Sequence, residues 1–254
     1  MSAVYWILQH VSDVSPSDDW LSASEREFLA GLRAAKRRRE WRLGRWTAKR
    51  ALARAGVAGV AESDLGGWAR MSILTTEAGV PHALVGETEA RWALSLSHSD
   101  EYGLCAVAER PVLVGCDIER IGRRGEEFAV DWFTDDERAF VGSIRAAEKR
   151  SQMVMLVWSA KESALKALGV GLRLSTQEVQ VEPVRGQVRS PSSELDLRRP
   201  TPDAGREMAA TGDRWSPLLV RAPGRLLHGW WWTDGNRVMT IVAEPAPASP
   251  LSLW

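Results

Sequence analysis

Residues 111–120 read PVLVGCDIER, an apolar segment that ends with two acidic residues, Asp117 and Glu119. The apolar run predicts a buried strand, and because side chains alternate along a strand, both carboxylates should share one face beside Gly115. Two carboxylates this close repel each other unless both are solvated, nearby arginines neutralise them, or a divalent cation lies between them. The segment alone leaves these three interpretations open.

A long helix is predicted downstream over residues 145–168, with its end at Gly169. In its segment WSAKESALK, Glu162 and Lys166 are four residues apart and share a face, in the order that favours an ion pair. The simplest interpretation is a weak surface salt bridge. However, Trp158 lies one turn before Glu162, so the charged face borders an apolar one. A half-buried glutamate beside a lysine can also form a base next to a phosphate-binding cation.

The N-terminal part predicts a strand in VYWILQHV, residues 4–11, followed by two helices. The first helix should start at a capping box formed by Ser24 and Glu27. The second should span about residues 36–55, with Gly44 on its core-facing side. Its other face carries a basic stripe, which is either a solvated face or a polyanion site. The stripe consists of Arg38, Arg42, Arg45 and Lys49.

Residues 91–108 predict two strands joined by a short turn at 97–101. Ser97 and His98 should lie at the end of the first of these strands. A histidine in such a position more often has a structural hydrogen-bonding role, although an imidazole and a hydroxyl at a strand end can also bind a phosphate. The motif by itself does not decide between these roles.

The composition changes at residues 184–216, where Pro, Ser, Arg and Asp without an apolar period predict a long loop. Three strands should follow, in WSPLLVRA, LLHGWWWTD and RVMTIVAEP, with a hairpin turn at TDGN. The segment from 245 to 254 is expected to form a tail. Helices and strands in both halves of the chain predict an α+β protein in which two sheet-and-helix units pack together.

The overall composition is that of a globular protein, with 254 residues, 44% of them apolar, and 33 basic residues against 33 acidic ones. This balance gives no reason to expect a nucleic-acid or membrane partner. The sequence shows neither a membrane-spanning run nor a basic N-terminal leader, and both cysteines, Cys105 and Cys116, lie in apolar context. We therefore expect a soluble, cytoplasmic protein with reduced thiols.

Four motifs taken together, and in this order, resemble one family. Gly44-Arg45 in the basic helix, SLSH, VGCDIE and WSAKESALK resemble the 4′-phosphopantetheinyl transferases of the Sfp-like subclass, over about residues 40–175. The resemblance implies an α+β fold of two similar halves related by a pseudo-two-fold, residues 1–110 and 111–254, with coenzyme A in the cleft between them. It also implies Mg²⁺-dependent transfer of 4′-phosphopantetheine from coenzyme A to a serine of an apo acyl or peptidyl carrier protein, which releases adenosine 3′,5′-bisphosphate.

The resemblance also implies roles for individual residues. Asp117, Glu119 and Glu162 would hold Mg²⁺; Arg45, Ser97, His98 and Lys166 would bind coenzyme A; Glu162 and Lys166 would be catalytic. The serine and histidine would lie near the 3′-phosphate and Lys166 at the pyrophosphate. Glu162 would take the proton of the carrier serine, directly or through water, and Lys166 would stabilise the departing nucleotide.

One position departs from the family pattern. Val80 stands where many members carry a lysine or an arginine near the 3′-phosphate. Arg42, Arg45 and Lys49 are the cations that would replace it.

Two other functions agree less well with the sequence. A nuclease with Asp and Glu-x-Lys chemistry would place its glutamate and lysine two residues apart on a strand, whereas Glu162 and Lys166 are four apart in a predicted helix. A non-catalytic relative that binds an anion or a partner through the basic helix would leave the three carboxylates without a role. We therefore expect a transferase, acting as a monomer.

Overall fold

The structure is a computed structural model that describes residues 3–57, 60–183, 215–246 and 250–253. The loop predicted at 184–216 therefore lies almost entirely outside the described residues. None of the helices in the described part of the chain is long and apolar enough to cross a membrane.

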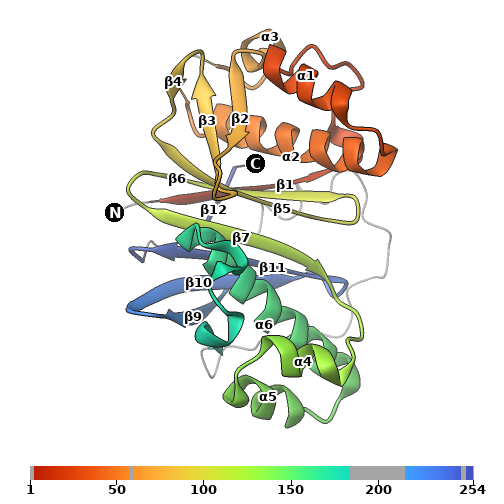
Figure 1. Cartoon of the computed structure of the whole chain (residues 1–254), viewed down its shortest axis with the longest axis vertical. Helices are drawn as coiled ribbons and strands as arrows, with labels where there is room; N and C mark the ends of the chain where they lie inside the picture. The colour runs from red at the N-terminus through yellow and green to blue at the C-terminus, as the bar shows by residue number, and fades with distance from the viewer. Residues whose placement is uncertain (1–2, 58–59, 184–214, 247–249, 254) are drawn as a thin grey trace.

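Two β-sheets stack on each other, and one long helix covers the outer face of each sheet (Figure 1). The first sheet has the strand order β12-β1-β6-β5 and consists of β1 (Val4–His10), β5 (Trp92–Ser99), β6 (Tyr102–Glu109) and β12 (Leu251–Ser252). The second has the order β7-β11-β10-β9-β8 and consists of β7 (Leu113–Arg120), β8 (Gln180–Pro183), β9 (Ser216–Ala222), β10 (Arg225–Thr233) and β11 (Arg237–Glu244). The prediction of a mixed α+β protein is confirmed.

The helices and a small third sheet complete the described elements. The small sheet is formed by β2 (Met71–Thr75), β3 (Pro81–Val85) and β4 (Thr88–Glu89). The helices are α1 (Ala23–Gly31), α2 (Ala35–Arg54), α3 (Leu65–Trp68), α4 (Glu126–Trp132), α5 (Asp135–Gly142) and α6 (Ala147–Leu168), with short 3-10 turns η1 (Val11–Asp13), η2 (Gly171–Arg173) and η3 (Thr176–Glu178). In Figure 1, α2 lies above the first sheet and α6 below the second.

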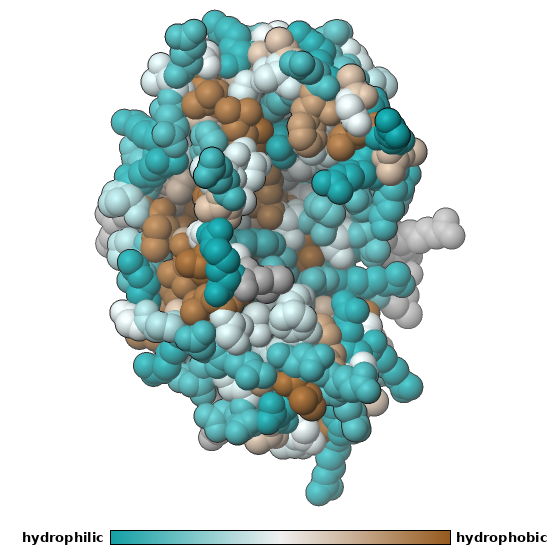
Figure 2. All heavy atoms as spheres, in the orientation of Figure 1, coloured by the Kyte–Doolittle hydropathy of each residue, from teal (hydrophilic) through white to brown (hydrophobic). Residues whose placement is uncertain are grey.

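Three apolar clusters fill this four-layer arrangement. One lies between α2 and the first sheet, one between α6 and the second sheet, and one between the two sheets. Both cysteines are buried and neither forms a disulfide, as predicted. The face shown in Figure 2 is mostly hydrophilic, with separate hydrophobic patches in its upper part and along its left side.

The helix ends follow the expected capping rules, with one correction. The long helix α6 ends at Gly169, whose φ of 67° lies in the left-handed region that glycine adopts without strain. The capping box of α1, however, is formed by Ser22 and Glu25, so the prediction of Ser24 and Glu27 was wrong. Both pairs have the same spacing, and the earlier one is used because it directs Glu25 into the core.

A buried glutamate–lysine pair ties each long helix to its surroundings. Glu25 pairs with Lys49 of α2, and Glu137 with Lys161 of α6, where Nζ lies 2.7 Å from Oε2. Each lysine also donates to two backbone carbonyls, and each glutamate also accepts a backbone N–H from a strand. All four side chains are at most 2% exposed, so these charges are satisfied entirely inside the protein.

The predicted basic stripe is therefore not a solvated face. Lys49 points into the core, and Arg38 donates to the carbonyl oxygens of residues 29 and 32. Arg42 donates to the carbonyl of Ser15 at 2.6 Å and pairs with Asp18 at 2.9 Å. Helical spacing predicted the stripe, but three of its four cations form contacts with other segments of the protein.

The C-terminal segment corrects a second expectation. The hairpin of β10 and β11 forms around the predicted turn. The residues after it, expected to be a tail, instead return to the first sheet, where β12 pairs in parallel with β1. The backbone N–H of Leu253 then donates to the carbonyl of Trp6 at 3.0 Å.

Candidate active site

The strand β7 and the helix α6 pack without an intervening side chain at Gly115. A Cβ added to Gly115 would lie 1.9 Å from the carbonyl oxygen of Ser163, so only glycine permits this approach. The predicted alternation is confirmed, because Val114, Cys116 and Ile118 join the cluster between the sheets while Gly115 faces α6. Asp117 follows on the same face as Gly115 and therefore reaches the side chains of α6.

Asp117 connects three segments that are distant in the sequence. Its side chain is 5% exposed, and its Oδ1 accepts hydrogen bonds from Lys166 Nζ and from Ser97 Oγ, both at 2.7 Å. Its buried Oδ2 has no hydrogen-bond partner among the described residues. Lys166 also donates to the carbonyl of Cys116 at 3.2 Å. Lys166 of α6 therefore pairs with Asp117 of β7 and does not form the simple salt bridge with Glu162.

Glu119 is held by a residue of the WSAKESALK motif to which the sequence analysis assigned no role in the site. The indole N–H of Trp158, on α6, donates to Glu119 Oε1 at 3.0 Å. Burial raises the pKa of Glu119 and the charge of Asp117 raises it further, while the bond from Trp158 opposes this shift. The signal for Trp158 was its position one helical turn before Glu162, but spacing alone does not show which strand it faces.

Glu162 is partly buried and, within the described residues, its carboxylate forms neither a hydrogen bond nor an ion pair. Burial raises its pKa, and the charge of Asp117 raises it too, although Lys166 opposes both. For Lys166 burial acts to lower the pKa, but the neighbouring Asp117 outweighs it and the pKa is raised. A carboxylate with a raised pKa beside a charged lysine can act as a base near neutral pH.

The three carboxylates are not arranged as a ready-made metal site. In the part of the chain that the structure describes, no group of three or more His, Cys, Asp or Glu side chains is placed to hold a metal ion. The charge of Asp117 nevertheless raises the pKa of both Glu119 and Glu162. Together with the unpartnered Oδ2 of Asp117, this is an environment that a cation would stabilise.

A cavity of about 570 Å³ adjoins this acidic cluster. It is lined by residues of α2 and β5, including Arg45, Ser97 and His98. Ser97 therefore belongs to both regions, because it lines the cavity and donates to Asp117. Gly44 also lines the cavity, so the expectation that it faces the core was wrong.

Arg45 is the cation of the former stripe that remains directed at this cavity. Its guanidinium carbon lies 4.7 Å from the centre of the Trp41 ring, and its Nε is 4.0 Å from Glu25 Oε1. Burial lowers the pKa of Arg45, although Glu25 opposes the shift. Arg42 and Lys49 are engaged with Asp18 and Glu25, so Arg45 is the one of these three cations that lines the cavity.

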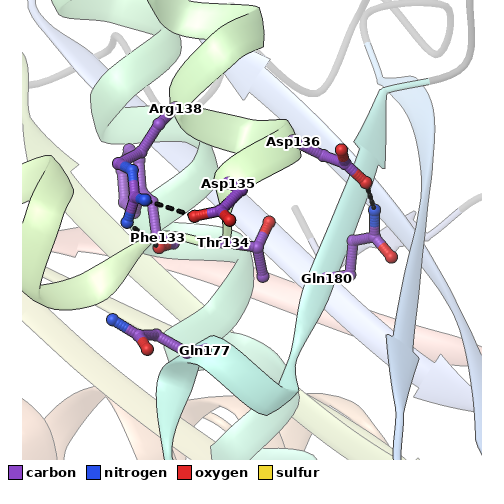
Figure 3. Close-up of a pocket in the computed structure, with 7 residues that line it drawn as sticks. All are labelled: Phe133, Thr134, Asp135, Asp136, Arg138, Gln177 and Gln180. Atoms are coloured by element: carbon purple, nitrogen blue, oxygen red, sulfur yellow. Dashed lines mark hydrogen bonds and ion pairs between the residues drawn. The ribbon is translucent and has the colours of Figure 1, made fainter.

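A second cavity, of about 360 Å³, lies at the N-terminal end of α5 (Figure 3). Two pairs of its polar side chains bond to each other: Arg138 with Asp135, and Gln180 Nε2 with Asp136 Oδ2 at 3.0 Å. None of the predicted site residues lines this cavity. We therefore place the candidate active site at Asp117 and not here.

Part of the chain is similar to known proteins. Residues 113–204 match the family model described as the 4′-phosphopantetheinyl transferase superfamily. The 4′-phosphopantetheinyl transferase gsp of Aneurinibacillus migulanus is 36% identical over 78 residues, which are 31% of this chain and 32% of that protein. The aligned segment thus spans about a third of the length of the relative. The family match begins at the first residue of β7 and includes all of α6.

Proposed function

We propose that the chain belongs to the 4′-phosphopantetheinyl transferase superfamily, whose family model its residues 113–204 match, and that it transfers 4′-phosphopantetheine from coenzyme A to a serine of an apo acyl or peptidyl carrier protein. Adenosine 3′,5′-bisphosphate would be the second product. One observation carries the proposal: Ser97 lines a cavity with a partly buried arginine and also bonds to Asp117 of the acidic cluster. A nucleotide bound in the cavity would extend its phosphates toward that cluster.

We propose that Asp117, Glu119 and Glu162 hold Mg²⁺ together with phosphate oxygens of coenzyme A. Mg²⁺ usually takes one or two protein carboxylates and completes its shell with water and substrate phosphates, so a preassembled cage is not required. The unpartnered Oδ2 of Asp117 is the best available ligand atom. When bound, the ion would neutralise charge on the pyrophosphate.

The side chains of α6 would perform the remaining steps. Glu162 would accept the proton of the carrier serine, since burial gives it a raised pKa and no other group of the described residues occupies its oxygens. Lys166, held by Asp117 but 30% exposed, would donate to the oxygen of the departing phosphate. Arg123 and Arg124, both exposed on the segment after β7, would favour encounter with an acidic carrier protein.

At the other end of the site, Arg45 and His98 would bind the phosphate of the nucleotide. His98 is exposed and Arg45 is partly buried, so an anion can reach both from the cavity. Ser97, expected at the 3′-phosphate, is engaged with Asp117. We propose that it orients that carboxylate and contacts coenzyme A only secondarily.

We also propose that residues 1–110 and 111–254 are two similar halves related by a pseudo-two-fold. In support, the segment from Trp46 to Lys49 reads WTAK and that from Trp158 to Lys161 reads WSAK. Both lysines are buried and pair with a glutamate that caps the preceding helix. We propose in addition that the protein acts as a monomer in the cytoplasm.

The alternative of a non-catalytic relative that binds through the basic helix is less well supported. Such a function would use the basic stripe of α2, whereas three of its four cations, Lys49, Arg38 and Arg42, are used for internal contacts. In such a relative, no bound cation would offset the repulsion among the carboxylates of Asp117, Glu119 and Glu162.

The proposed activity is tested directly with the wild-type protein. Incubated with coenzyme A, Mg²⁺ and a panel of apo acyl and peptidyl carrier proteins, it should add one phosphopantetheine to a serine of at least one carrier, detected by intact-protein mass spectrometry. Omission of Mg²⁺ with a chelator present should stop the reaction. A panel without any mass increase would refute the proposed function, and the panel also identifies the preferred carrier class.

Trp158→Phe tests how Glu119 is held. The variant keeps the aromatic packing but removes the N–H that donates to Glu119 Oε1. Because groups that orient metal ligands contribute about 10- to 100-fold to metal affinity, we expect about a 10-fold weaker affinity for Mn²⁺, measured by electron paramagnetic resonance in the presence of coenzyme A. Trp132→Phe, a change of another indole packed on Trp158, serves as the control. Equal Mn²⁺ affinities of Trp158→Phe and wild type would exclude this role.

A further inference from the structure

Gly44 is a glycine in the middle of a long helix for which protein packing gives no reason. It lies within α2 (Ala35–Arg54), where glycine destabilises a helix relative to alanine. At Gly115 and Gly103 an added Cβ would collide with neighbouring atoms, but at Gly44 it would meet nothing within 4 Å. The space in front of Gly44 is the cavity of about 570 Å³.

The chemistry around this space suits an anionic ligand. The next residue, Arg45, has a side chain only 16% exposed, and its Nε has no hydrogen-bond partner within the described residues. The Trp41 ring and the Glu25 carboxylate, 4.0 Å from Nε, hold the guanidinium without forming a hydrogen bond to that donor. Lys36 and Arg37 add exposed cations to the same cavity. A buried, incompletely paired guanidinium is costly unless a ligand completes its hydrogen bonds.

We infer that Gly44 is a specificity-determining residue: its missing side chain leaves the room through which the phosphate-bearing nucleotide end of coenzyme A reaches Arg45. This inference rests on the proposed function. The helix accepts a residue of poor helix propensity because any side chain at this position would project into the ligand's space. Stability and ligand affinity should therefore respond in opposite directions when a side chain is added.

Two variants test this, Gly44→Ala and Gly44→Leu, each titrated with coenzyme A and with adenosine 3′,5′-bisphosphate by isothermal titration calorimetry. Gly44→Ala should raise Tm by about 1–4 °C, because alanine favours the helix, and should weaken binding of both ligands. Gly44→Leu should weaken both by about 5- to 100-fold, the range of an overpacked site, without a lower Tm. Should Gly44→Leu fail to fold, Gly44→Ala decides alone.

Arg39→Leu is the matched control, because Arg39 is exposed on the same helix and does not line the cavity. It should leave both affinities unchanged. Wild-type affinity in both Gly44 variants would overturn the inference while leaving the proposed function standing. If the wild-type protein itself binds neither ligand, the proposed function fails and the inference falls with it.

Discussion

Replacing Glu162 with glutamine is expected to reduce phosphopantetheine transfer by roughly 100- to 10,000-fold, the contribution of a positioned general base. The amide keeps the shape of the side chain but cannot accept a proton or contribute charge to a metal site. The free energy of unfolding should stay within about 1 kcal/mol of wild type. It should not fall, because burial already disfavours the carboxylate, as the raised pKa of Glu162 indicates.

This combination separates a catalytic role from a structural one. Transfer is measured by mass spectrometry of the carrier, and stability by urea unfolding. Glu148→Gln is the matched control, since Glu148 is an exposed glutamate in the first turn of the same helix. It should retain full activity. Unchanged turnover of the Glu162→Gln protein would remove Glu162 from the mechanism.

The elements that carry this site could be predicted because local rules decide them. Alternation in β7 put Asp117 and Glu119 on one face, and the four-residue spacing in α6 put Glu162 and Lys166 on another. The end of α6 followed from Gly169. These predictions needed only the period of the element.

Contacts between segments far apart in the sequence could not be predicted in the same way. Lys166 pairs with Asp117 rather than with Glu162, because the close approach at Gly115 brings α6 onto β7. Helical spacing likewise placed Lys49 on a basic stripe, although its partner Glu25 draws it into the core. The repeat of WTAK and WSAK was the available signal, since two lysines in equivalent positions of buried helices suggest internal partners.

Lys161→Met is expected to lower the free energy of unfolding by about 3–5 kcal/mol, the cost of breaking a buried ion pair by removing one partner. Lys161 is fully buried, and its Nζ binds Glu137 at 2.7 Å and the carbonyls of Thr176 and Val179 at 2.6 Å each. Methionine fills similar space but leaves the Glu137 carboxylate buried beside two unpaired carbonyl oxygens. The free energy is measured by urea unfolding monitored by circular dichroism.

A double variant shows how much of this loss of stability comes from the Glu137 carboxylate that is left buried without its partner. Glu137→Gln combined with Lys161→Met removes both charges and should recover part of the lost stability, while the glutamine can still form the capping box with Thr134. Lys149→Met is the control on the same helix, because among the described residues its amine bonds only to the Gln152 side chain, at 2.9 Å. It should cost less than about 1 kcal/mol.

The same comparison decides what Lys161 does for the site. Lys161 precedes Glu162 directly, yet its side chain points into the core, toward α5 and the segment before β8, and not toward Asp117. We therefore expect the Lys161→Met protein to keep most of its activity per folded molecule at low temperature, and to lose activity on heating as it unfolds. Loss of transfer in a fully folded Lys161→Met protein would instead show that the ion pair positions Glu162, because only α6 connects the two.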